Sequence, residues 1–600
     1  MSLFSGLYVG SSGLVTNQNA LNTTAHNLSN IGTVGYTRQQ IIQANKHYDT
    51  IGQAAVSAQQ VGLGVSYADV RAVRDYFLDK TYRQEQGRAE YYTTNYNAIT
   101  EMENLFGELQ GVAFQESLSE LTRAVEELKK QPEDGTNQGL LMSKAQSFLE
   151  RAQSVYSGLA GFQDNMNLQI KDNIDKINDY GKKIWEINQK VIAIETGGIE
   201  RANDLRDARD QLLDELSALG KISYDEDIHG VVTVEFEGVE FVTQDYVNEM
   251  GYLKGDEYNE LFAEDIAKGL KSQVDSDFYV PTWPKFKHQE VFSVTEDINP
   301  DKNTDIGALK ALYNARGNRR GTYRDLFQAG ETYPEYPALN TSIKINGVEY
   351  TPTKTGDHYD PINADGKIYN VSDDGVVTPD GSSKPIGQLG ISEANSINYY
   401  GSKTTRSSVM TVMAEFDNLV RGIVTGMNKI LSSDGTAEGT DTDNLLFSKI
   451  SDKSVPDGTD GWTTANLMIN PTVQKTPSSL NNGFLLDDGS RDQLKADALV
   501  ELFSNKFSAL NPETGTPLTF AGYYAALVSE NASSGKVYQS ISTNQEAMVM
   551  AIDSQRQEVV GVSDSDELTQ MIRYQNAYNA SSRYINTINS MLDTLINSMT

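Results

Sequence analysis

The sequence SNIGTVGYTRQQ, residues 29–40, marks the point at which the chain changes character. The residues before it carry almost no charge and include a leucine at every seventh position, and Arg38 is the first Lys or Arg of the chain. Gly32 and Gly35 can adopt backbone conformations that other residues avoid. We therefore predict a long uncharged helix that ends here and a turn that leads the chain outward. A routine helix C-terminus followed by glycine would by itself explain both glycines.

The two ends of the chain share one hydrophobic pattern, in which apolar positions recur at alternating spacings of four and three. This spacing is typical of a coiled-coil seam. The N-terminal seam includes Leu7, Leu14, Leu21 and Leu28, and the C-terminal seam includes Met571, Tyr578, Ile585, Leu592 and Leu595. Because the flanking residues are mostly Asn, Ser and Thr rather than charged residues, we expect the two helices to pair, to be covered by neighbouring subunits, and to become ordered on assembly.

The prolines separate the helical ends from a different middle. Of 15 prolines, only Pro132 precedes Pro281, and none follows Pro517. Proline breaks helix interiors, so long helices are possible at both ends and not in the middle. Residues 230–242 alternate with period two around a glycine turn, and residues 342–352 contain an Asn-Gly turn signal, so both predict β-hairpins.

These patterns predict a multidomain α+β fold with terminal coiled-coil helices, a long helical bundle and a nested β-rich middle region. The predicted units are residues 1–36 with 562–600 (terminal coiled coil), 37–227 with 405–434 and 491–561 (helical bundle), 228–319 (β-rich domain), 320–404 (inserted outer subdomain) and 435–490 (loops and short strands).

The composition limits the partners. The chain has 600 residues and a net charge of −32, which disfavours nucleic acid and anionic lipid because phosphates are repelled. No apolar run approaches the ~18 residues that a membrane span needs. The N-terminus lacks the basic region of a cleaved signal peptide. We expect no nucleic-acid partner, no membrane partner and no cleaved signal.

The sequence predicts no catalytic, cofactor-binding or metal site. The absence of cysteine excludes disulfides and thiolate ligands. Asp207 and Asp210 flank Arg209, which is compatible with a glycosidase carboxylate pair, but carboxylates on a charged helix are far more often surface ion pairs. The five histidines lack metal-ligand spacing.

Four separated stretches resemble bacterial flagellar axial proteins, in the expected order. The first, NALNTTAHNLSNIGTVGY (residues 19–36), is similar to the N-terminal signature shared by rod, hook and junction proteins. Its continuation GYTRQ (35–39) and the other three stretches, residues 61–86, NDLRDARDQLLDELS (203–217) and residues 561–599, are similar to the hook-associated protein 1 family. The motif residues carried over are Asn27, Asn30, Gly35, Tyr36 and Arg38.

This resemblance implies a structural subunit between the flagellar hook and filament, whose terminal helices line the inner tube. It also implies export without signal cleavage through the flagellar type III system to an extracellular position. The implied partners are further copies of the chain in the axial polymer, the hook protein, a second junction protein and an export chaperone at the C-terminus. Two alternatives stay open: another axial protein of hook or rod type, or a flagellar scaffold that displays a binding or enzymatic insert at 320–404.

Overall fold

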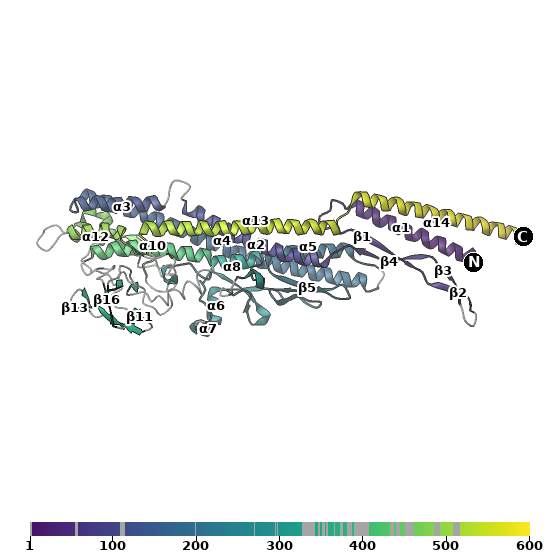
Figure 1. Ribbon diagram of the computed structural model, residues 1–600, viewed down its shortest axis with the longest axis horizontal. Coiled ribbons are helices and arrows are strands. Elements are labelled where there is room, and N and C mark those ends of the chain that lie inside the picture. The colour runs from purple at the N-terminus through teal and green to yellow at the C-terminus, as the bar shows by residue number, and fades with distance from the viewer. Residues whose placement is uncertain are drawn as a thin grey trace.

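The computed structural model is an elongated molecule with both chain termini at the same end (Figure 1). The structure describes residues 3–599 apart from 54–57, 108–113, 198–199, 269, 294–295, 297, 327–342, 346–347, 351–353, 356–357, 365, 372–375, 381–386, 389–406, 433–436, 438, 440–444, 451–460, 485–492, 508–509 and 511–516.

The terminal end consists of helices α1 (Leu3–Ser29) and α14 (Asp564–Met599), which lie side by side and project beyond the other helices (Figure 1). The prediction of a helix at each end of the chain is confirmed. Neither segment contains proline, and α1 contains no Asp, Glu, Lys or Arg.

Four strands follow α1 and form two antiparallel pairs: β1 (Gln39–Asn45) with β4 (Val65–Ala72), and β2 (Tyr48–Gln53) with β3 (Ala58–Gly62). The prediction of a helical bundle from residue 37 is therefore wrong for this segment. It rested on the absence of proline, which permits a helix without requiring one. The β-branched pair Ile41 and Ile42 favours a strand instead, and the side chain of Ile41 in β1 is buried.

Long helices form the body of the molecule. Their bounds are α2 (Tyr76–Phe106), α3 (Phe114–Lys130), α4 (Gly135–Glu195), α5 (Asn203–Leu219), α10 (Ser408–Leu431), α12 (Gln493–Ser504) and α13 (Phe520–Val560). Asp75 caps α2 by accepting a hydrogen bond from Phe77 N at 2.9 Å. The aromatic rings of Phe106, Phe114 and Phe416 pack together where α2, α3 and α10 meet.

Two three-stranded antiparallel sheets pack against α4 through β7 and β9. They are β5 (Ile222–Glu226), β6 (Val232–Phe236) and β7 (Val239–Val242), and β8 (Gly251–Lys254), β9 (Tyr279–Trp283) and β10 (Gln289–Glu290). The hairpin predicted at 230–242 is confirmed: β6 and β7 pair across a turn at Glu237 and Gly238, both of which have positive φ. The first sheet begins at Ile222, before the predicted domain boundary at 228.

Short helices complete the middle region. They are α6 (Gly255–Leu261), α7 (Ala263–Ala267), α8 (Ala308–Arg316) and α11 (Pro471–Lys475), with 3-10 turns at Pro284–Phe286, Pro300–Lys302, Tyr323–Leu326, Thr464–Asn466 and Pro477–Phe484. The segment predicted as loops and short strands, 435–490, thus also contains short helical turns, and parts of it lie outside the described residues.

The insert at 320–404 contains short antiparallel strands in its described parts. They are β11 (Ile343–Ile345), β12 (Val348–Tyr350), β13 (Lys354–Thr355), β14 (His358–Tyr359), β15 (Ile362–Ala364), β16 (Lys367–Val371), β17 (Val376–Pro379) and β18 (Gly387–Gln388); a further pair, β19 (Phe447–Lys449) and β20 (Leu467–Ile469), lies later in the chain. The hairpin predicted at 342–352 is confirmed by the pairing of β11 with β12.

Candidate functional site

The face of α1 that meets α14 is lined by glycine. A Cβ atom added to Gly10 would lie 2.8 Å from Ile585 Cγ1, and one added to Gly6 would lie 3.1 Å from Ile588 Cδ1. A Cβ on Gly13 would meet Ser581 Oγ at 2.9 Å. The two helices therefore approach more closely here than larger side chains would allow.

The seam of α1 lies one residue before the leucine repeat. Residues with the same alternating spacing of four and three continue this face, and most of them are buried: Gly6, Gly10, Gly13, Asn17, Ala20, Thr24 and Asn27. The leucines predicted as packing residues are half-buried and lie beside this face: Leu7, Leu14, Leu21 and Leu28. The pattern of leucines suggested the seam, but small residues make the intramolecular contact because they let the helices come together.

On α14, four of the five predicted residues lie on the less exposed face of the helix. Met571, Tyr578, Ile585 and Leu592 are half-buried, whereas Leu595 is exposed. That these nine residues pack between subunits stays a prediction. Sequence reasoning missed the three glycines of α1, although their spacing of four and three was a signal that could have identified them.

The outer faces of the two helices expose apolar side chains. On α1, Tyr8 is 67% exposed and Val15 is 50% exposed. On α14, Ile572 is 60% exposed and Ile596 is 58% exposed. Because these side chains lie on both helices of a slender projecting pair, the pair presents an apolar surface to its surroundings.

Asn27 fastens the end of α1 to the outgoing chain. Its Oδ1 accepts hydrogen bonds from Tyr36 Oη at 2.7 Å and from Gln39 N at 2.9 Å, and its Nδ2 donates to Gln39 O at 2.8 Å. The ring of Tyr36 packs edge-on against His26. Burial, and after it the negative charges of Asp207 and Asp204, raise the pKa of Tyr36, so its hydroxyl stays protonated and can donate to Asn27.

The turn between α1 and β1 uses the remaining motif residues. Asn30 Nδ2 donates to His26 O at 3.0 Å, and its Oδ1 accepts from Thr33 Oγ1 at 3.1 Å. Gly35 has a φ of +79°, which disfavours any residue with a side chain. The predicted role of this glycine as a turn residue therefore has a backbone reason.

The backbone of Arg38 joins three passages of the chain. Its N–H donates to Val560 O at 2.9 Å, at the end of α13, and its carbonyl accepts from Val73 N at 2.9 Å, after β4. At these three places the chain passes from α1 to β1, from β4 to α2, and from α13 to α14. We call residues 37–39, 72–75 and 560–563 the three connectors. The region in which the connectors meet is called the joint.

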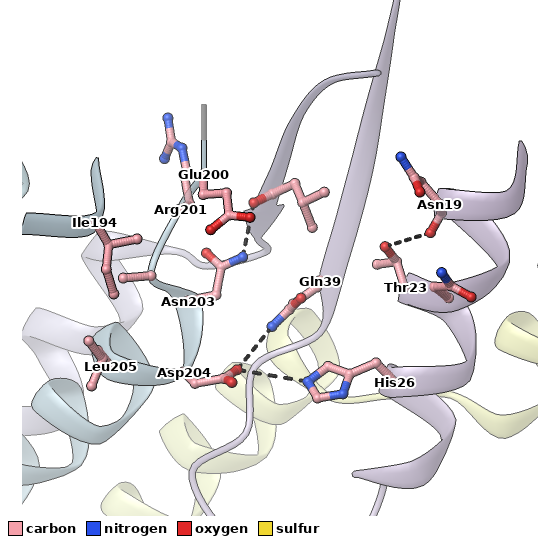
Figure 2. Close-up of a pocket in the computed structure, with 13 residues that line it drawn as sticks. Asn19, Thr23, His26, Gln39, Ile194, Glu200, Arg201, Asn203, Asp204 and Leu205 are labelled. Carbon is pink, nitrogen blue, oxygen red and sulfur yellow. Dashed lines mark hydrogen bonds and ion pairs between the residues drawn. The ribbon is translucent and has the colours of Figure 1, made fainter. Parts of the chain in front are cut away.

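A cleft of about 590 Å³ lies beside the joint, between α1, the strands β1 and β4, and the segment that links α4 to α5 (Figure 2). Asp204 projects toward it and contacts Gln39 Nε2 at 3.3 Å and His26 Nε2 at 3.8 Å. Its walls carry mainly amides, hydroxyls and carboxylates, with no paired nucleophile and base. Within the described residues, no group of three or more His, Asp or Glu side chains is placed to hold a metal ion.

None of the helices described here is long and apolar enough to cross a membrane.

Three segments of the chain match known protein families. Residues 99–278 match the helical domain of flagellar hook-associated protein FlgK. Residues 7–37, which cover α1 from Leu7 onward and most of the turn, match the flagella basal body rod protein family. Residues 546–599 match the C-terminal region of the flagellar basal body rod FlgEFG proteins.

Curated relatives cover the whole chain. Flagellar hook-associated protein 1 of Bacillus subtilis is 22% identical over 100% of this chain and 99% of that protein. The proteins of the same name from Salmonella typhimurium and Escherichia coli are 23% and 24% identical, each over 98% of both chains. A solved structure of the flagellar hook junction protein FlgK from Burkholderia pseudomallei aligns with 80% of this chain and 100% of its own, at 12% identity and a TM-score of 0.41. Along its whole length the chain is similar to the flagellar hook-associated protein 1 family.

Proposed function

We propose that the chain is a structural subunit of the bacterial flagellum at the junction between hook and filament. In this role its α1–α14 pair is buried among the same helices of neighbouring copies. The observation that carries the proposal is the apolar outer surface of that pair, at the terminal end of a chain whose relatives are hook-associated proteins. A surface of this kind gains free energy when it is removed from water, at about 25 cal/mol per Å².

The distribution of charge supports assembly through this pair. The chain carries a net charge of −32, whereas α1 contains no Asp, Glu, Lys or Arg. Acidic bodies repel one another, so attraction between copies must come from the nearly uncharged helices. Homo-oligomeric packing through α1 and α14 fits this arrangement.

The finer partners follow from the same proposal. The chain would contact the hook protein on one side and a second junction protein on the other. It would leave the cell through the flagellar type III system without losing a signal peptide, with an export chaperone bound near α14. The exposed apolar residues of α14, such as Ile572 and Ile596, give such a chaperone a surface to cover before assembly.

We propose no enzymatic role. The relatives are named flagellar hook-associated protein 1. The alternative of a displayed binding or enzymatic insert concerns residues 320–404, of which large parts lie outside the described residues. Its described core is a small apolar cluster of Ile362, Ala364 and Tyr369, and no observation favours a catalytic function there.

The test changes the outer surface of the terminal pair. Ile572→Asp and Ile596→Asp place a charge on exposed positions, so each should change the stability of the free chain by no more than about 0.5 kcal/mol. In a strain that lacks the gene, both variants should leave hooks without filaments and filament subunits in the medium. Electron microscopy of the hooks measures this.

The matched control is Ile228→Asp, at a position that is 95% exposed and lies between β5 and β6 in the body. This variant should restore filaments as well as the unchanged chain does. If the two α14 variants also restore normal filaments, the outer surface of the pair does not mediate assembly.

A further inference from the structure

Helix α5 carries four aspartates on one face, and the sequence alone suggested only surface ion pairs there. Their spacing of three, three and four residues keeps them in a row along the helix. We call Asp204, Asp207, Asp210 and Asp214 the acidic row.

The acidic row contacts the first connector, residues 37–39, which leads from α1 to β1. Asp207 Oδ2 accepts a hydrogen bond from the backbone N–H of Thr37 at 2.9 Å. Both residues are buried, with Asp207 7% exposed and Thr37 2% exposed. One turn earlier, Asp204 accepts from Gln39 Nε2. The outgoing chain is therefore held to α5 at two successive points.

The acidic row also contacts the second connector, residues 72–75, which leads from β4 to α2. Asp210 pairs with Arg74, which lies between β4 and α2. The same carboxylate pairs with Arg83 of α2 at 3.0 Å. Arg74 Nε lies 3.1 Å from Asp79 Oδ2, so the returning chain is tied to both α5 and α2.

The third contact of the acidic row is with the C-terminal part of α13, just before the connector at 560–563. Asp214 Oδ2 lies 2.8 Å from Arg556 Nη1, one turn before α13 ends at Val560. Asp214 Oδ1 pairs with Arg83 Nε at 2.7 Å, and the Arg83 side chain is 2% exposed. Arg556 also lies over the ring of Tyr82.

We propose that the acidic row of α5 positions the terminal helices: it holds the connectors at 37–39 and 72–75 and the last turns of α13, just before the connector at 560–563, and so sets where α1 and α14 leave the body. This inference rests on the proposed function, because it concerns how the assembling helices are presented. Connectors that are already fixed lose less conformational entropy when the helices join the polymer. Asp207 is the positioning residue of the row, because its partner is the backbone of the outgoing chain itself.

Asp207 gives a selective test because its partner is an amide. Asp207→Ala removes the acceptor from a buried N–H, whereas Asp207→Asn keeps a side-chain oxygen that can accept from Thr37. Removing one partner of the Asp214 pairs would instead leave a buried arginine without its charge partner, which destabilises the fold more generally. Glu215→Ala is the matched control, since Glu215 is an exposed carboxylate on the same helix and contacts Tyr180 of α4.

The first measurement is amide exchange in the full-length free chain, followed by mass spectrometry at fragment resolution. Asp207→Ala should raise the exchange rate of the Thr37 amide about tenfold or more, while the amides of α4 keep their rates. Asp207→Asn and Glu215→Ala should stay within about threefold of the unchanged chain. An unchanged Thr37 rate in Asp207→Ala, or an equal increase in Asp207→Asn, would overturn the proposal.

The second measurement is the fraction of hooks that carry filaments in the complemented strain. Asp207→Ala should reduce it at normal export levels, and Asp207→Asn should restore it. Normal filaments with Asp207→Ala, despite rapid exchange at Thr37, would also overturn the positioning role. Failure of the proposed function is a separate result: it would appear as normal filaments in the strain that lacks the gene altogether.

Discussion

At the scale of single residues, Gly10 sets how closely α1 and α14 approach each other. Its position between Ile585 and Tyr584 leaves no room for a Cβ atom without a shift of the neighbouring helix. Each glycine costs a helix about 1 kcal/mol relative to alanine, and a glycine seam buries no side chain of its own. The close approach is therefore obtained with little gain in stability for an isolated pair.

We predict that Gly10→Val separates the two helices and impairs assembly. The added side chain would overlap Ile585 Cγ1 and Tyr584 Cδ1, which lie 2.8 and 3.0 Å from the Cβ position. The number of filament-bearing hooks in a complemented strain measures the effect, and we expect it to fall at least severalfold.

Gly161→Val is the matched control. Gly161 lies within helix α4, and a Cβ there would meet nothing within 4 Å. Both substitutions place the same β-branched residue in a helix, so they share the cost in helix propensity. Equal behaviour of the two variants would show that the contact at Gly10 does not matter for assembly.

At the scale of elements, a buried carboxylate holds α10 to the segments around it. Asp417 accepts hydrogen bonds from Thr464 N at 2.6 Å, Thr464 Oγ1 at 2.7 Å and Tyr323 N at 2.9 Å. Desolvation by burial raises the pKa of Asp417 to about 6, against the opposing effect of these hydrogen bonds. The side chain therefore joins three segments that are far apart in sequence.

The raised pKa of Asp417 predicts a pH-dependent stability. Between pH 4 and 6 the folded chain binds a proton at this site that the unfolded chain has released, so stability falls as the pH rises through this window and levels off above about 6. The free energy of unfolding of the unchanged chain, minus that of Asp417→Asn, should therefore fall by an amount on the order of 2 kcal/mol from pH 4 to 7. Denaturant titrations at several pH values measure this difference, and a difference that is flat or rises with pH would contradict the assignment.

Periodicity in the sequence predicted the elements better than it predicted their contacts. The alternation at 230–242 predicts a hairpin because β6 turns alternate side chains toward the core, and the Asn-Gly turn signal at 342–352 predicts the pairing of β11 with β12. The segment 39–72 was missed because its helical assignment used only the absence of proline. The α1 seam was displaced by one residue because leucine is the larger hydrophobic residue, whereas close helix contact favours glycine.

The joint could be predicted only in part. The family motif identifies Asn27, Tyr36 and Arg38. It does not identify their hydrogen-bond partners, which can lie hundreds of positions away, as Val560 does from Arg38. For Asp207 the sequence predicts only a surface ion pair, because it does not tell which face of α5 is covered. Which charges are buried depends on tertiary packing that no local pattern encodes.

At the scale of the whole molecule, the acidic body and the nearly uncharged terminal pair have different roles. The body has an extensive hydrophobic core that includes long helices such as α4 and α10. The terminal pair projects beyond it and contacts mainly β1 and β4 besides its own partner helix (Figure 1). We therefore expect the body to fold by itself and the pair to gain most of its stability from neighbouring copies.

The most direct test is amide exchange in α1 and α14, compared between the free chain and the assembled flagellum. We predict rapid exchange at residues 7–28 and 571–599 in the free chain, slow exchange at the same residues after assembly, and slow exchange in the helices of the body in both states. Strong protection of both terminal segments in the free monomer would contradict the claim that they need neighbouring copies to be stable.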